Sequence, residues 1–163
     1  MDAYLVIASK RDERRFAERR IPEDVVERIL DAGRLSGNSQ NKQAWRFVVV
    51  DDPERRERLA QTAYRPSLVR ECALVVGICG RPYDVGRCSQ NMMLAAWNEG
   101  VVSCPAGLGD RAAAAEALGL DEEPVMAIVF GYPARPRDPE SRPAEEWSAR
   151  ANRKPLAEIV TRV

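Results

Sequence analysis

The clearest candidate for chemistry is a polar loop that leads into an apolar strand, GNSQNKQAWRFVVV, at residues 37–50. Its amide side chains can donate and accept hydrogen bonds, and Trp45 places a flat apolar face beside them. Such a combination can hold a planar heterocycle by its polar edge and its apolar body. The alternative is an ordinary surface loop followed by a core tryptophan, because Asn and Gln also satisfy local backbone groups. The amides are Asn38, Gln40, Asn41 and Gln43.

Two groups of cations form a second candidate. Lys10, Arg11 and Arg14 stand close together near the N-terminus, so they could converge on one phosphate through charge-assisted hydrogen bonds. Residues 150–154 include a second basic group, with Arg153 among them, which could meet the first if the C-terminal segment folded back. The alternative is a solvated run of charge, since the arginines of the first group continue as far as Arg20.

Glycines and a proline mark the third candidate, GVVSCPAGLGD, at residues 100–110. A tight backbone of this kind can bring bare amide groups close to a ligand. The alternative is a plain turn between two helices.

The composition excludes several kinds of site. The chain of 163 residues contains no histidine, which removes the commonest general base, the commonest metal ligand and every triad that needs an imidazole. The four cysteines lack metal-binding spacing, so we expect buried free thiols in a reducing compartment and no metal site. The 25 basic and 25 acidic residues cancel, which leaves no electrostatic argument for binding nucleic acid or membranes.

The predicted elements fit one α+β domain, a sheet flanked by helices. Apolar runs predict buried strands at residues 46–50, 73–79 and 125–130. Apolar stripes and capping residues predict helices at residues 2–9, from Pro22 onward, and at 51–61, 89–99 and 110–118. Residues 80–87 form a tight link between a strand and a helix. Regular alternation of strands and helices is absent, as is any glycine-rich phosphate-binding motif, so a classical nucleotide fold is not expected.

The composition changes at Pro133. Five of the eleven prolines lie beyond residue 132, together with many charges and few large apolar side chains, so this segment cannot build a core of its own. It is either a mobile tail or an arm that lies across another surface, such as a partner subunit. We therefore expect a single domain at residues 1–132 and a C-terminal arm at residues 133–163.

The order of these segments resembles that of the nitroreductase family of flavin enzymes. The family has an arginine-rich turn after its first helix, an amide loop entering a strand, a helix followed by a Pro/Gly segment, a strand ending in Gly-Tyr-Pro and a terminal basic motif. In this chain these read KRDERRF, NKQAWRF, QNMMLAAWNEGVVSCPAGLG, VMAIVFGYP and RKPL. The resemblance spans nearly the whole chain and rests on the ordered set. It implies a nitroreductase-like α+β fold with a mainly antiparallel sheet.

The resemblance also implies that FMN is the cofactor and that the protein is a homodimer with the flavin at the subunit interface. The C-terminal arm would then wrap the partner subunit. Asn41 and Gln43 would contact the ribityl chain or the ring edge. The implied phosphate ligands are Lys10, Arg11, Arg14 and Arg153, and the backbone implied to lie beside the reactive ring nitrogen is that of Pro105, Ala106 and Gly107.

Three departures from the family pattern bear on this expectation. Asp12 stands where the family usually has a serine that touches the phosphate, and a carboxylate there repels a phosphate unless an arginine neutralises it. Ala44 replaces the usual proline. The link at residues 80–87 is shorter than the stretch that helps to cover the flavin in similar proteins. We expect weaker flavin binding or a more open site.

The predicted function is an FMN-dependent oxidoreductase that uses NAD(P)H to reduce electron-poor acceptors such as nitroaromatics or quinones. A flavin needs only binding, orientation and electrostatic tuning from the protein, so no catalytic side chain is expected and histidine can be absent. The alternative is a flavin-binding homodimer of the same fold with little or no turnover. Nucleic-acid binding through residues 11–20 is disfavoured by the zero net charge. Because no signal peptide and no membrane-length apolar run is visible, we expect a cytoplasmic protein.

Overall fold

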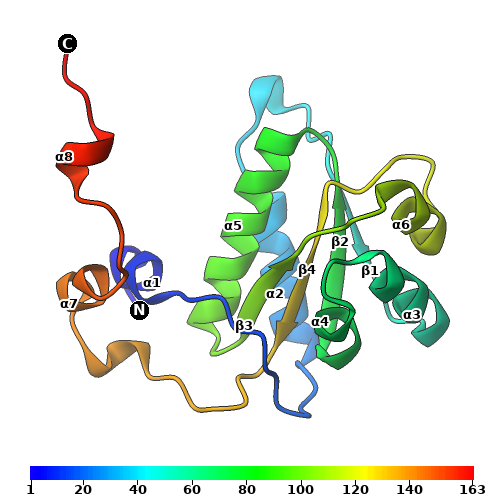
Figure 1. Ribbon diagram of the computed structural model, residues 1–163, viewed down its shortest axis with the longest axis horizontal. Coiled ribbons are helices and arrows are strands. Elements are labelled where there is room, and N and C mark those ends of the chain that lie inside the picture. Colours follow the sequence, from blue (N-terminus) through cyan, green and yellow to red (C-terminus); the bar gives the residue numbers. More distant parts are fainter. The chain divides into compact units, whose positions relative to one another are not determined.

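The computed structural model describes all of residues 1–163 and divides them into two compact units. Residues 11–137 form the first, here called the core unit. Residues 1–10 and 138–163 form the second, here called the terminal unit. The first ten residues therefore pack with the C-terminal segment, and the two ends of the chain share one unit (Figure 1).

The core unit is built on a four-stranded sheet in the order β1-β2-β4-β3. Its strands are β1 (Arg46–Val49), β2 (Leu74–Cys79), β3 (Val102–Ala106) and β4 (Met126–Gly131). All three neighbouring pairs are antiparallel, which confirms the expected α+β fold with a mainly antiparallel sheet. The two central strands are almost wholly buried, whereas β1 and β3 form the edges.

Helices cover both faces of this sheet (Figure 1). On one face lie α2 (Glu23–Arg34) and α5 (Pro82–Asn98), and on the other lie α3 (Pro53–Thr62), α4 (Pro66–Glu71) and α6 (Arg111–Leu118). Two separate apolar clusters result, because successive side chains of a strand point to opposite faces. In β2, for example, Val75 belongs to the cluster under α3 and Val76 to the cluster under α2.

Short polar signals set the helix ends as the sequence predicted. The Asp52 carboxylate accepts the N–H of Arg55 at the start of α3, and Asp110 accepts the N–H of Ala113 at the start of α6. Gly119 ends α6 with a φ of 70°, a conformation that favours glycine. The predicted helices at residues 51–61 and 110–118 and the three predicted strands are thereby confirmed.

Two local predictions are wrong. The segment at residues 100–110 is not a compact turn, because Val102–Ala106 pairs with β4 as an edge strand. Pro105 is tolerated there because an edge strand has one side that needs no ladder hydrogen bond. Helix α5 begins at Pro82 rather than at Ser89, so the link from β2 is shorter than residues 80–87. Proline in the first turn favours this early start.

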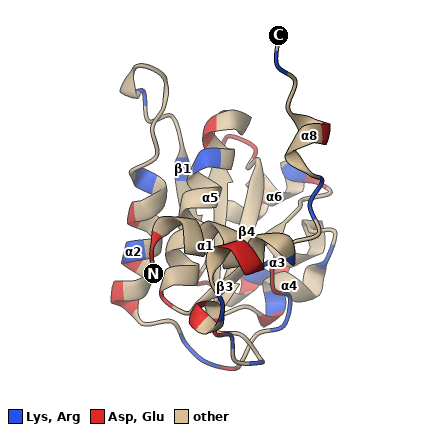
Figure 2. Ribbon diagram, turned by 90° about the vertical axis from the view of Figure 1, so that its left-hand side faces the viewer, with Lys and Arg blue, Asp and Glu red and all other residues tan.

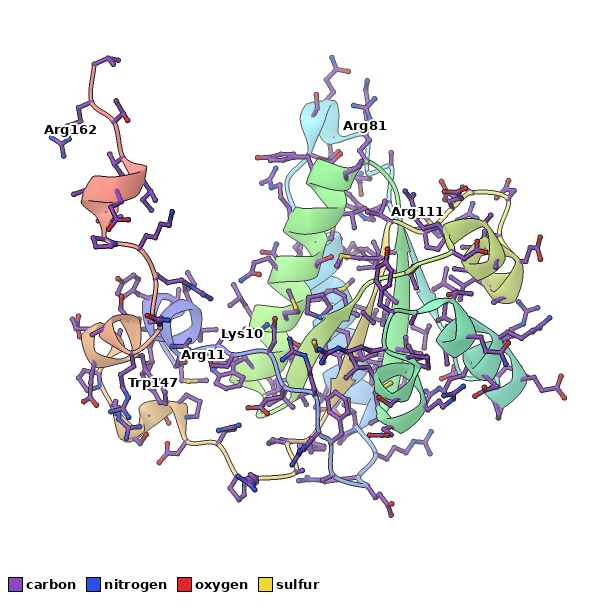
Figure 3. The ribbon with its side chains drawn as sticks, viewed as in Figure 1. Lys10, Arg11, Arg81, Arg111, Trp147 and Arg162 are labelled. Carbon is purple, nitrogen blue, oxygen red and sulfur yellow. The ribbon has the colours of Figure 1, made fainter.

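The terminal unit contains short helices only: α1 (Ala3–Ser9), α7 (Ala144–Ala149) and α8 (Leu156–Ile159). Helix α1 packs against α7, and the Trp147 indole donates to the Pro139 carbonyl at 2.8 Å (Figures 1 and 3). Several apolar side chains remain exposed, including Leu156 and Ile159 of α8. In the whole protein, no helix combines the length and the apolar character needed to cross a bilayer.

A glycine just after β2 provides a test of this arrangement. Gly80 has a φ of 128°, and a Cβ atom there would lie 2.6 Å from the carbonyl oxygen of Ala44. We expect Gly80→Ala to lower the free energy of unfolding by roughly 1–3 kcal/mol, because both the backbone conformation and the close approach are lost. The matched control is Gly86→Ala in α5, where a Cβ meets open space and helix propensity should raise the free energy by roughly 0.5–1 kcal/mol. Urea unfolding measures both, and equal effects would contradict the argument.

Candidate functional site

The outer edge of β3 gathers two segments that are far apart in the sequence. At one end the N–H of Glu13 donates to the Ser103 carbonyl at 3.1 Å, and Asp12 bridges to Ser103. At the other end the N–H of Tyr64 donates to the Gly107 carbonyl at 3.0 Å, and Ala63 pairs with Leu108. The strand edge between these two attachments is left without a neighbouring strand.

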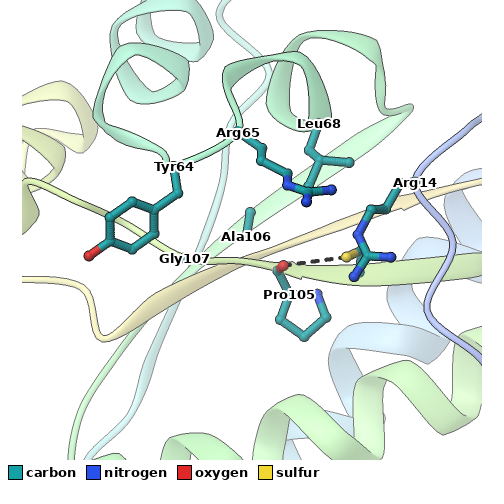
Figure 4. A pocket seen from close by; sticks show the side chains of 8 residues that line it. Arg14, Tyr64, Arg65, Leu68, Pro105, Ala106 and Gly107 are labelled. Carbon is teal, nitrogen blue, oxygen red and sulfur yellow. Dashed lines mark hydrogen bonds between the residues drawn. The ribbon is translucent and has the colours of Figure 1, made fainter.

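A hollow of about 210 Å³ opens along this uncovered edge (Figure 4). Its walls come from the arginine-rich segment, from β3 and from the connection between α3 and α4. The lining residues are Arg14, Tyr64, Arg65, Leu68, Cys104, Pro105, Ala106 and Gly107. No acidic residue is among them, so the lining is positively charged.

The backbone of Gly107 contributes a donor to this hollow. Its carbonyl points away from β4, toward Tyr64, and in a strand the N–H of a residue points to the same side as its carbonyl. No hydrogen bond from the Gly107 N–H is formed within the chain. Pro105, two residues earlier on the same side, has no N–H to offer. The strand edge therefore presents one unused amide donor at the pocket.

The guanidinium groups of Arg14 and Arg65 turn toward one another above Pro105 (Figure 4). Neither forms an ion pair. The acid beside Arg14 in the sequence, Glu13, is bound by Arg137 instead. Arg70 shows the contrast, because its hydrogen bonds to Glu57 lower the pKa of that carboxyl to about 2.

The amide loop at residues 36–44 lies elsewhere in the core unit. It projects beyond the N-terminal end of α5, near Arg81, and away from α4 and β3 (Figures 1, 2 and 3). The hollow is lined by residues of α4 and β3. No residue of the loop lines the hollow. Within one chain, therefore, the structure does not bring Asn41 and Gln43 to the residues of the β3 edge.

This loop is held in an unusual backbone conformation. Gln40, Asn41 and Gln43 all have φ between 50° and 54°, a region that non-glycine residues seldom occupy. The Asn38 Oδ1 atom accepts the N–H of Gln43 at 2.8 Å, and Ser36 accepts the Asn91 amide at 2.8 Å. Local strain of this kind persists only where the surroundings enforce it, and it concentrates at ligand-contacting segments.

Other predicted residues are placed as follows. Arg14, Pro105, Ala106 and Gly107 line the hollow together, while Arg11 and Asp12 precede Arg14 along the same edge. Lys10 and Arg153 belong to the terminal unit. The residues that sequence reasoning missed are Tyr64, Arg65 and Leu68, because the only local signal there is Pro66 at a helix start.

All four cysteines are buried and none is part of a disulfide, as predicted. Burial raises the pKa of the Cys72 thiol to about 11 and also raises the pKa of Cys79 and Cys88. Cys104 borders the hollow, and its Sγ donates to the Pro105 carbonyl at 3.4 Å (Figure 4). Because a protonated thiol is a poor nucleophile, Cys72, Cys79 and Cys88 are inert packing groups.

The chain is similar to known proteins over most of its length. The nitroreductase family profile matches residues 7–71 and 81–132, which is most of the chain. The chain belongs to the nitroreductase family. Among its relatives is a protein of Methanothermobacter thermautotrophicus named as an NADH dehydrogenase/NAD(P)H nitroreductase. The two are 26% identical over 90% of this chain and 88% of that protein.

Solved nitroreductase structures share the fold. A nitroreductase family protein from Clostridium difficile matches 99% of this chain and 98% of its own with a TM-score of 0.82 at 23% identity. A nitroreductase from Desulfovibrio desulfuricans, solved in complex with FMN, matches 100% and 98% with a TM-score of 0.82 at 25% identity. In the present chain, the segments that match the family profile include every predicted site residue except Arg153.

Proposed function

We propose that this nitroreductase is an FMN-dependent oxidoreductase that uses NAD(P)H to reduce electron-poor acceptors such as nitroaromatics or quinones. The observation that carries the proposal is the uncovered edge of β3, where the cation Arg14 and the unused Gly107 amide border one hollow. The family membership and the FMN complex of the Desulfovibrio relative support the choice of cofactor.

The chemistry of the donors fits FMN. Guanidinium groups bind phosphate and other oxyanions through paired hydrogen bonds, and the hollow has no acid to compete for them. A bare glycine amide suits close approach by a ring nitrogen. We assign the phosphate to Arg11 and Arg14 and, on the family resemblance alone, to Lys10 and Arg153.

When bound, FMN supplies the redox chemistry by accepting a hydride from NAD(P)H and passing electrons to the acceptor. The residues of the chain then have three tasks. Arginines hold the phosphate, the Gly107 N–H donates to the ring, and Asn41 and Gln43 hold the ribityl chain or the ring edge. None of these tasks requires a general acid or base, which accounts for a working site without histidine.

A homodimer would complete this site. The hollow of about 210 Å³ is smaller than the roughly 300–1,000 Å³ of ordinary ligand pockets, and the amide loop lies away from it. A two-fold axis could place the amide loop of one copy over the β3 edge of the other, because the same surfaces meet twice in such an interface. Residues 1–132 would form the flavin-binding domain, and the arm at residues 133–163, with exposed Leu156 and Ile159, would cover the partner.

A second candidate is a flavin-binding homodimer with little or no turnover. Three observations favour it: Asp12 stands at the β3 edge, Ala44 replaces a proline in the amide loop, and the link between β2 and α5 is too short to form a cover. Both candidates bind flavin as a homodimer, and only the first reduces an acceptor with NAD(P)H.

The spectrum and turnover of the purified protein test the proposal. We expect a two-band flavin spectrum, release of FMN on denaturation, and NAD(P)H oxidation with menadione or nitrofurazone. A colourless protein that takes up no FMN on reconstitution would overturn the proposal. Bound flavin without oxidation of NADH or NADPH by any acceptor would favour the second candidate instead.

The carboxylate at position 12 should weaken flavin binding. We expect Asp12→Ser to lower the Kd for FMN about three- to tenfold, because it removes a negative charge near the assigned phosphate position. Asp51→Ser, which removes an equally negative but distant exposed side chain, is the matched control. Quenching of flavin fluorescence during titration of the apoprotein measures both. Weaker binding in Asp12→Ser would show instead that Asp12 orients an arginine.

Subunit mixing tests whether the site is shared. Arg14→Gln and the double variant Asn41→Ala/Gln43→Ala should each bind FMN poorly. If each site combines the β3 edge of one copy with the amide loop of the other, a mixture of the two variants regains one intact site per mixed dimer. At random pairing this recovers about a quarter of the wild-type sites. No recovery after co-refolding, with dimers verified by light scattering, would place both elements in one chain.

A further inference from the structure

Tyr64 and Arg65 lie in the connection between α3 and α4 and line the hollow, and neither was among the site residues predicted from the sequence. The backbone of this connection is fixed to the strand edge, because the Tyr64 N–H donates to Gly107 and the Gly109 N–H donates to Thr62 at 2.7 Å. The two side chains are nevertheless exposed, Tyr64 to 78%. A rigid backbone that presents two exposed side chains to a pocket suits them to recognise a ligand.

The tyrosine ring lies along a strip of glycine. A Cβ atom added at Gly107 would come within 3.0 Å of Tyr64 Cδ2, and one added at Gly109 within 3.2 Å of Tyr64 Cε1. Glycine at both positions therefore makes room for the ring beside the strand edge. One side of the ring is supported by backbone, and the rest remains available for contact with another planar group.

The neighbouring guanidinium carries charge that nothing in the chain neutralises. Arg65 forms no ion pair, and across the hollow it faces Arg14, a second cation without one (Figure 4). Two like charges that line one hollow repel one another until an anion enters. A planar guanidinium favours carboxylates and related oxyanions, which it can bind through two parallel hydrogen bonds.

Under the proposed function, Arg14 serves the flavin phosphate, and this leaves Arg65 to face the incoming substrate. We propose that Tyr64 and Arg65 make this enzyme selective for acidic aromatic acceptors, with the acceptor ring against Tyr64 and its carboxylate or phenolate bound by Arg65. The inference rests on the proposed function for its redox step. The residues themselves act by binding alone, so no covalent step is assigned to them.

Two acceptors that differ in one charge provide the test: 4-nitrobenzoate and 4-nitrobenzamide. For the flavin-loaded wild-type protein we expect a higher kcat/KM with 4-nitrobenzoate. Arg65→Gln should lower the ratio of the two kcat/KM values about tenfold, the effect of one charge-assisted hydrogen bond at a partly exposed site. The loss should appear in KM, because an interaction made equally in ground and transition states does not change kcat. Arg65→Lys should retain part of the selectivity.

The matched control is Arg58→Gln, which removes the same charge from an exposed arginine of α3 that does not line the hollow. It should leave the ratio unchanged. A ratio that falls equally in both variants would show general electrostatic attraction and would overturn the assignment to Arg65. A Tyr64→Leu variant should raise KM for both acceptors without changing their ratio.

Two further measurements test whether Arg65 binds a phosphate group of FMN or NADPH instead of the acceptor. If Arg65 binds the FMN phosphate, Arg65→Gln will weaken FMN binding and spare riboflavin binding. If it binds the 2′-phosphate of NADPH, KM will rise for NADPH alone. Either result overturns the proposal. Calorimetric titration of the two acceptors reports binding without turnover, so equal affinities would sink this inference while a flavin spectrum still supported the proposed function.

Discussion

The site depends on an edge strand that is left partly uncovered. In β3, one side pairs with β4 and the other side is met only at its two ends, by residues 12–13 and by residues 63–64. An exposed strand edge is a hazard for aggregation, and proteins limit it with proline or with covering segments. Here Pro105 and the two attached segments limit the uncovered stretch to the part of β3 that lies between them. The Gly107 amide and the hollow exist because the ladder is not continued.

The same edge explains how remote residues become neighbours. The arginine-rich segment and the connection between α3 and α4 are separated by about fifty residues, yet each ends on the same strand. Because backbone hydrogen bonds hold both, their side chains need no acidic partner to fix them in place. Arg14 and Arg65 can therefore remain unpaired, while arginines elsewhere, such as Arg70, are spent on surface ion pairs. Fixing cations by backbone attachment keeps their charge available to a ligand.

Features with a local cause could be predicted from the sequence, and features with a distant cause could not. The caps Asp52 and Asp110 act within three residues of their own helices, so those helices were predicted closely. Strand β3 was mistaken for a turn because Pro105 and two glycines dominate its local pattern, whereas its pairing with β4 lies more than twenty residues away. Arg65 gave no signal at all, since only the strand edge turns it into part of a pocket. The ordered family pattern did single out Arg14 and Gly107, and the structure places both in the lining of the hollow.

The choice of groups at this edge has a further consequence. Histidine would make the charge of the site depend on pH near neutrality, but the chain has no histidine. Guanidinium groups and backbone amides keep one protonation state throughout the physiological range. The charge that Arg14 and Arg65 contribute to the hollow is therefore constant over a wide range of pH. If the proposed reduction of an acceptor takes place beside β3, solvent that enters the open hollow can supply its protons. Under the proposed function, access of solvent therefore suits a site whose assigned residues supply charge and orientation.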